Sequence, residues 1–203
     1  ATAITILADI ARNSTFCDMD KERNVVLEEI ASIEDVPEEY IHEILTEKIW
    51  PNHPLGRFVS GYEHTVEALT LDDVRDYYKQ WYLPQNMYIS IAGNFDEDAV
   101  LGQLAQEFGS LPAGTTPARP EPPVFTTGIE TVHRDIAQNH VCLVFPGPTV
   151  AENRRYVYDL LWSALGGGST SRLFQRIRED EGLAYSIYTF HSAYFTAGMF
   201  GVK

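Results

Sequence analysis

Apolar side chains recur every three or four residues through most of the first half of the chain, which is the spacing of an amphipathic helix. This spacing predicts helices over residues 1–12, Asp20–Ile33, Asp35–Ile49, 70–81 and Asp96–Phe108. Pro37 would lie in the first turn of the third helix, where its missing N–H does no harm. Pro51 and Pro54 would end that helix, and the stretch Asn52–Thr70 is typical of a loop.

Strand-like runs are concentrated in the second half of the chain. The patterns predict strands at Met87–Ala92, Thr131–Ile136, His140–Phe145, Ala184–Phe190 and Gly198–Val202. Between them, Thr149–Glu152 has the pattern of a capping box for a helix that Gly166–Gly168 would stop. A shorter helix around Leu173, Phe174 and Ile177 would stop near Gly182.

A proline-rich segment separates these two halves. Residues 112–128 carry five prolines and little periodicity, which is typical of a linker: Pro112, Pro117, Pro120, Pro122 and Pro123. The predicted class is α+β, with one partial domain at 1–112, a linker at 113–128 and a second partial domain at 129–203. Both ends of the chain interrupt a predicted element, so we expect it to be a piece of a longer protein.

Composition excludes two classes of partner. A formal net charge of −14 argues against nucleic acid, because phosphate binding needs clustered lysine and arginine. No apolar run reaches the roughly 20 residues that cross a bilayer, so we expect no membrane span. The two cysteines, Cys17 and Cys142, are too few and too far apart to suggest a disulfide framework or a metal knuckle.

Two acidic residues share one face of the second predicted helix. Glu22 and Glu29 are seven residues apart, which places them within about 20° around the helix axis. Val25 and Val26 lie on the same face, and a carboxylate on a buried apolar face needs a counter-charge or a cation. The pattern fits either a metal ligand with an acidic neighbour or an ordinary solvated acidic helix.

The histidines and glycines give no complete motif by themselves. None of the six histidines forms a His-x-x-x-His pair around a glutamate on a helix. His53 and His64 fall in or beside the predicted loop, where hydrogen bonding is the ordinary role of a histidine. Gly166–Gly168 lacks the Gly-Lys-Ser/Thr end of a phosphate loop, so we interpret it as a turn that lets two backbones approach.

Arg178 and Tyr185 flank the predicted turn at Gly182. One lies late in a helix and the other early in a strand, so the turn can bring both toward one pocket. Their donors suit a carbonyl or a developing oxyanion. A surface arginine beside a core tyrosine is the alternative interpretation.

Three stretches resemble the zinc peptidases of the pitrilysin/insulinase family. They are Glu22–Ile30 (ERNVVLEEI), His53–Gly56 (HPLG) with Gly61 and Tyr82–Met87 (YLPQNM), and Leu165–Phe174 (LGGGSTSRLF) with Arg178–Tyr185 (REDEGLAY). The resemblance covers nearly the whole chain, and the last stretch is the most specific. It implies two metallopeptidase-type domains, each a mainly antiparallel sheet covered by helices.

The resemblance assigns a role to four residues. Glu29 would be a zinc ligand, Glu22 the acidic residue that supports the zinc site, and Arg178 with Tyr185 the pair that holds the substrate backbone. The family's His-x-x-Glu-His helix, which supplies two more ligands and the general base, has no match in this sequence. We therefore expect the chain alone to be inactive and to bind Zn²⁺ weakly or not at all.

The function implied is a zinc-dependent endopeptidase acting on unstructured peptides, paired as a homodimer or with a second subunit. One alternative is a non-catalytic subunit that supplies Arg178 and Tyr185 to a catalytic partner, and another is an acidic binding module without catalysis. The compartment stays open between bacterial cytoplasm or periplasm and the mitochondrial matrix.

Overall fold

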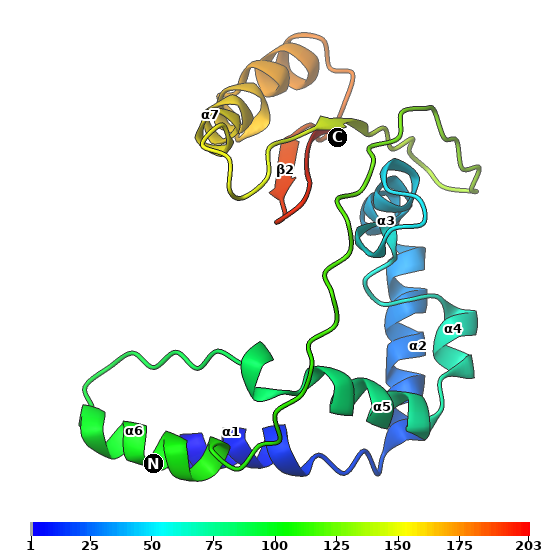
Figure 1. Ribbon diagram of the computed structural model, residues 1–203. Helices are drawn as coiled ribbons and strands as arrows, with labels where there is room; N and C mark the ends of the chain where they lie inside the picture. The colour runs from blue at the N-terminus through cyan, green and yellow to red at the C-terminus, as the bar shows by residue number, and fades with distance from the viewer. Residues whose placement is uncertain (1) are drawn as a thin grey trace. The chain divides into compact units, whose positions relative to one another are not determined.

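The computed structural model describes residues 2–203, and its helices lie largely where the apolar spacing predicts them. In the first half they are α1 (Thr2–Asn13), α2 (Met19–Asp35), α3 (Pro37–Ile49), α4 (Glu63–Ala68), α5 (Leu71–Trp81) and α6 (Glu97–Phe108), with short 3₁₀ turns η1 (Pro54–Gly56) and η2 (Pro84–Asn86) (Figure 1). Helix α4 lies in the stretch predicted as a loop. No helix within residues 2–203 is long and apolar enough to cross a membrane.

The second half contains β1 (Leu143–Pro146), α7 (Arg155–Gly166), the π-helical segment η3 (Phe174–Asp180), β2 (Thr189–Ala193) and β3 (Gly198–Val202). Strand β3 has the predicted bounds. Helix α7 begins later than predicted. The Thr149 N–H and hydroxyl both donate to the Glu152 carboxylate, at 3.0 and 3.2 Å, but they close a turn instead of the first helical turn.

The chain folds into two compact units. One comprises the residues up to Glu28 together with Tyr62–Arg119, and the other comprises Glu29–Gly61 with Pro120–Lys203. Each unit is therefore built from two separate segments of the chain, and α2 contributes residues to both. The sequence-based division into 1–112, 113–128 and 129–203 stays a prediction.

Two of the predicted strands are wrong for the described chain. Residues 87–92 and 131–136 form no strand, although Met87 keeps extended dihedral angles, with φ −104° and ψ 135°. A strand needs neighbours to pair with, and a lone extended segment gains too little from its own contacts to be stable. The α+β class is confirmed, with a sheet in the second unit and none in the described part of the first.

The first unit is held together by contacts between its helices. Helices α1 and α6 lie side by side (Figure 1), where the Thr5 hydroxyl donates to the Glu107 carboxylate at 3.1 Å. The Tyr78 hydroxyl of α5 donates to the Ala11 carbonyl at 2.5 Å, and the ring of Phe16 meets that of Tyr78 edge-on at 5.3 Å. The Tyr78 side chain thus joins α5 to α1 and to the segment that follows α1.

A three-stranded antiparallel sheet in the order β1-β3-β2 organises the second unit. Phe200 of β3 lies opposite Phe145 of β1 and His191 of β2. Tyr188 and Lys203 exchange two backbone hydrogen bonds of 2.9 Å, which extend the β2–β3 ladder by one pair.

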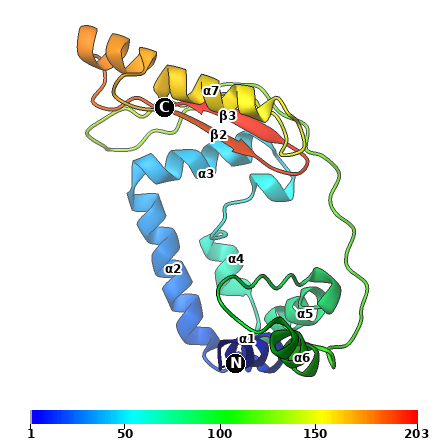
Figure 2. The same ribbon diagram turned by 90° about the vertical axis from the view of Figure 1, so that its left-hand side faces the viewer.

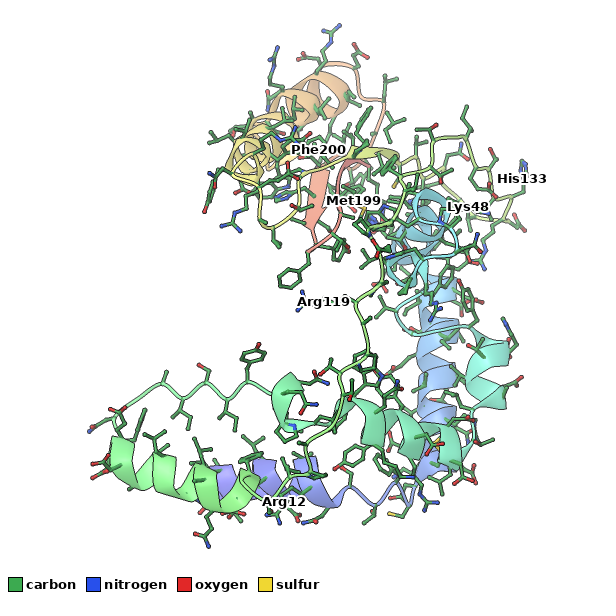
Figure 3. All side chains as sticks on the ribbon, viewed as in Figure 1. Arg12, Lys48, Arg119, His133, Met199 and Phe200 are labelled. Atoms are coloured by element: carbon green, nitrogen blue, oxygen red, sulfur yellow. The ribbon has the colours of Figure 1, made fainter. Side chains whose placement is uncertain are left out.

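Helices α3 and α7 cover opposite faces of this sheet (Figure 2). Successive side chains of a strand alternate between faces, so Met199 and Phe200 point to opposite faces of the sheet (Figure 3). Met199 packs with Ile49 and Trp50 at the end of α3, and Trp50 is only 1% exposed. Phe200 meets Tyr158 of α7 edge-on, with ring centroids 5.7 Å apart.

Helix α7 approaches β2 closely at its final residue. A Cβ on Gly166 would lie 2.4 Å from the Thr189 backbone nitrogen, so only glycine allows this approach. Just before it, the Trp162 indole donates to the Thr189 carbonyl at 2.8 Å, and the Thr189 hydroxyl donates to the Trp162 carbonyl at 2.9 Å. The sequence-based interpretation of the glycine run as a point of close backbone approach is confirmed.

The outer edge of β1 is interrupted by a proline. Gly147 donates to Gly198 at 2.8 Å, so alternation along the ladder turns the backbones of Val144 and Pro146 away from β3. Pro146 has no N–H to offer on that side. On the opposite edge, the outward positions of β2 include His191 and Ala193.

Replacing Gly166 by alanine is expected to destabilise the second unit. The added methyl would meet the backbone of Thr189, and overpacking of this kind costs about 1–3 kcal/mol in free energy of unfolding. Gly168→Ala in the same glycine run is the matched control, since its Cβ would meet no atom within 4 Å. Urea unfolding followed by circular dichroism would measure both variants, and equal effects would contradict the close-approach argument.

Helix α3 also carries a histidine that should make stability depend on pH. His42 lies against Phe190 with ring centroids 4.9 Å apart, and its Nε2 is 3.5 Å from the Tyr188 hydroxyl. Burial, and secondarily the Lys203 charge, lower the pKa of His42 below its ordinary value of 6.5. The folded state therefore binds this proton less tightly than the unfolded state, and stability falls as pH drops below 6.5 through the lowered value.

As the pH falls from about 7.5 to about 5.5, we expect the free energy of unfolding of His42→Gln to decrease less than that of the parent. The measurement is the urea midpoint at each pH. His133→Gln is the control, because His133 is exposed and projects outward (Figure 3). An unchanged pH dependence in His42→Gln would show that another group carries it.

Candidate functional site

A turn at Gly182 connects η3 to the chain leading into β2. Gly182 has φ 61°, a left-handed conformation that a residue with a Cβ adopts only with strain. The Leu183 N–H donates to the Ile177 carbonyl at 2.9 Å, and the Glu181 N–H donates to the Arg176 carbonyl at 3.2 Å. These bonds fold the chain after Gly182 back over the last turn of η3.

The fold brings Arg178 and Tyr185 together, as the sequence predicts. The Arg178 guanidinium carbon lies over the Tyr185 ring, 5.3 Å from its centroid, within the range of a cation–π interaction. Tyr185 is 81% exposed and the Arg178 side chain 38% exposed. Both side chains are therefore accessible to a ligand and held side by side, so the turn does bring together the two donor groups.

Phe174 completes this cluster, and the sequence analysis did not assign it a role at the site. The Arg178 guanidinium carbon lies 4.7 Å from the Phe174 ring centroid. An i, i+4 spacing on one helical segment places the two side chains on the same face. The signal was available in the run Phe-Gln-Arg-Ile-Arg at 174–178, where an aromatic precedes the arginine by one turn.

The charges beside the pair leave the arginine largely available. Arg176 makes ion pairs with Glu181 at 2.8 Å and with Asp180 at 3.8 Å. The carboxylate of Glu179 approaches Arg178 Nε only to 3.8 Å, and an exposed ion pair of that length contributes little. The remaining guanidinium N–H groups can donate to a carbonyl or carboxylate of a ligand.

The two carboxylates of α2 lie on one helix, as predicted, on a face that is not buried. Glu22 and Glu29 are both exposed, about 10 Å apart along the axis for seven residues of α-helix. Val25 on the same face is 42% exposed. This face is exposed in the described chain, as the solvated-helix interpretation expects, so desolvation gives no reason for a cation here.

The described residues do not by themselves make a zinc site. Within residues 2–203 there is no group of three or more His, Cys, Asp or Glu side chains that could hold a metal ion. Glu29 could supply one carboxylate ligand, whereas protein zinc sites use three or four. Further ligands would have to join Glu29 before zinc could bind there.

Two histidines are engaged elsewhere. His53 accepts from the Leu55 N–H at 3.1 Å through Nδ1, so its Nε2 donates to the Glu121 carbonyl at 2.9 Å. This confirms the interpretation of His53 as a loop hydrogen-bonder. His191 of β2 pairs with Asp159 of α7 at 3.2 Å, a contact between elements that no sequence-local spacing could reveal.

Comparison with known proteins matches residues 68–203 to the family model described as "Peptidase M16 inactive domain". An uncharacterized zinc protease of Bacillus subtilis strain 168 is 40% identical over 199 residues, covering 97% of this chain and 48% of the relative. Another from Streptomyces coelicolor is 38% identical, covering 98% of this chain and 46% of the relative. The chain thus spans about half the length of the curated relatives it matches.

Solved structures share the fold at lower identity. A crystal structure described as the peptidase M16 inactive domain from Pseudomonas fluorescens superposes with a TM-score of 0.89 at 22% identity, covering 98% of this chain and 50% of that one. A protease from Helicobacter pylori gives 0.80 at 19%, with coverage of 99% and 51%. The family model matches well over half of the chain, so the chain belongs to the M16 peptidase family, the pitrilysin/insulinase-type family that its Gly-rich and Arg178–Tyr185 motifs resemble.

Proposed function

We propose that this chain carries the substrate-holding part of a zinc-dependent endopeptidase that cleaves unstructured peptides. The observation that carries the proposal is the accessible Arg178–Tyr185 pair at 5.3 Å, positioned by the Gly182 turn. The zinc-protease name of a relative that is 40% identical supports the reaction class. Further zinc ligands would have to join Glu29 to complete the metal site.

Arg178 and Tyr185 would hold a carbonyl of the substrate backbone. The guanidinium offers several N–H donors in one plane and the phenol offers one O–H donor, so together they can converge on one oxygen atom. Donors aimed at a carbonyl on which negative charge develops stabilise the transition state more than the ground state. Because every peptide presents the same carbonyl, this contact gives affinity with little sequence selectivity.

Glu29 would contribute a carboxylate to the zinc ion, and Glu22 would support the site from two turns earlier on α2. Their exposure fits this role, since a ligand must be reachable by a metal whose other ligands come from elsewhere. Hydrolysis would then need a longer protein or an assembly, and the described chain alone would be inactive. We propose pairing with a second copy or a related subunit as the form in which the site is complete.

A non-catalytic subunit of the same fold is the second candidate. The match of residues 68–203 to a family model described as an inactive domain is compatible with it. Such a subunit would present Arg178 and Tyr185 to a catalytic partner, and Glu29 would have no ligand role. The two candidates differ in whether Glu29 affects zinc content.

Glu29→Gln is expected to lower the zinc bound by the protein made from its complete gene, from about one ion per chain toward none. The amide keeps the shape of the side chain but loses the charge that binds the cation. Glu28→Gln, at the neighbouring exposed position, is the matched control. Zinc would be measured by atomic absorption after dialysis. Equal zinc in both variants would leave the non-catalytic subunit as the better candidate.

Arg178→Gln is expected to reduce kcat/KM for an unstructured peptide by about 100-fold, the order seen when an oxyanion donor is removed. Tyr185→Phe, which loses one hydroxyl, should cost about tenfold. Arg176→Gln is the control, since Arg176 lies on the same turn and makes ion pairs with Asp180 and Glu181. A similar loss in Arg176→Gln would indicate damage to η3 instead of loss of a substrate contact.

A further inference from the structure

We propose that Phe174 is a positioning residue: its ring holds the Arg178 guanidinium in the orientation in which the Arg178–Tyr185 pair binds a peptide carbonyl. The inference rests on the proposed function and adds a third member to the pair. It is motivated by two ring contacts to one guanidinium, at 4.7 Å from Phe174 and 5.3 Å from Tyr185.

An arginine with no fixed partner samples many rotamers, and ordering it on binding costs conformational entropy. Arg178 lacks a close ion pair, since Glu179 is 3.8 Å from its Nε and about half exposed. The aromatic faces are therefore the contacts that restrict the guanidinium. A ring stacked on the guanidinium leaves the in-plane N–H groups pointing outward, which is where a carbonyl would be met.

The two rings differ in how firmly they are held. Tyr185 lies beyond the Gly182 turn and is 81% exposed. Phe174 is partly buried at the start of η3, directly after the loop that follows α7. The Phe174 ring is therefore the more firmly held of the two, and the Tyr185 side chain has room to move toward a ligand.

Segment η3 itself supports this division of roles. Its π-helical winding is rare in proteins and occurs frequently at functional sites. Near its start, the Gln175 N–H donates to the Ser171 carbonyl at 3.0 Å, and the Gln175 side chain donates to the Ser169 carbonyl at 2.7 Å. These bonds anchor the residue beside Phe174 to the glycine-rich loop, so the backbone that carries the ring is held in place.

The test replaces Phe174 by mono-, di- and trifluorophenylalanine in the protein made from its complete gene. Fluorine withdraws charge from the ring face while leaving its shape nearly unchanged, so a cation–π contact weakens step by step. We expect kcat/KM for an unstructured peptide to fall progressively, by about 3- to 30-fold at the last step. The same series at Phe95, a half-exposed position in the other unit, should change nothing.

A second readout follows the arginine itself. With isotope-labelled arginine, the Arg178 Nε–H resonance should lie upfield of that of Arg176, because ring currents shield a proton above an aromatic face. Phe174→Leu should remove much of that shift, and Phe174→Tyr, which keeps a ring, should retain it. Phe174→Tyr should also keep most of the parent's kcat/KM.

The outcomes separate the inference from the function on which it rests. A graded loss together with the upfield resonance supports the inference. Unchanged kcat/KM throughout the fluorinated series, with Arg178→Gln still impaired, overturns it and leaves the substrate contact standing. An equal loss in the leucine and tyrosine variants, with a lowered melting temperature, also overturns it, since Phe174 would then only pack. If Arg178→Gln has no effect, the proposed function fails first.

Discussion

The second unit depends on the alternation of one short strand. Helices α3 and α7 cover opposite faces of the sheet, so the alternating side chains of its central strand β3 must pack on both sides. Met199 and Phe200 are both nearly buried, at 6% and 5% exposure, and they pack against α3 and α7 respectively. A one-residue slip of β3 would exchange the two faces. The positions of both helices are therefore fixed by the same register.

The candidate site inherits its geometry from that arrangement. Helix α7 reaches β2 through the glycine at its end, the glycine-rich loop then leads to η3, and Gly182 returns the chain toward β2. The segment that carries Arg178 and Tyr185 is therefore tied to the sheet at both ends. A pair of long side chains on a surface turn can be held in one arrangement only when the turn itself is anchored.

Local patterns predicted the parts of this molecule that depend on local forces. Helical spacing located α2, α3 and α5, and the glycines at 166–168 and 182 marked the turns, because propensity and capping act within a few residues. The Arg178–Tyr185 pair was also predictable, since one tight turn connects it. The strands at 87–92 and 131–136 were wrong because strand formation depends on partners elsewhere in the chain. The His191–Asp159 contact, for the same reason, could not be read from spacing, and the exposure of the α2 carboxylates depends on tertiary packing.

The proline on the outer edge of β1 has a consequence for how copies of the protein can meet. A sheet that polymerises by adding strands needs a receptive backbone on both sides of every copy. Here the β1 side lacks one of its donors at Pro146, while the β2 side still presents His191 and Ala193. Growth of a fibre through the β1 edge is therefore disfavoured, because every strand added there would miss one hydrogen bond at Pro146.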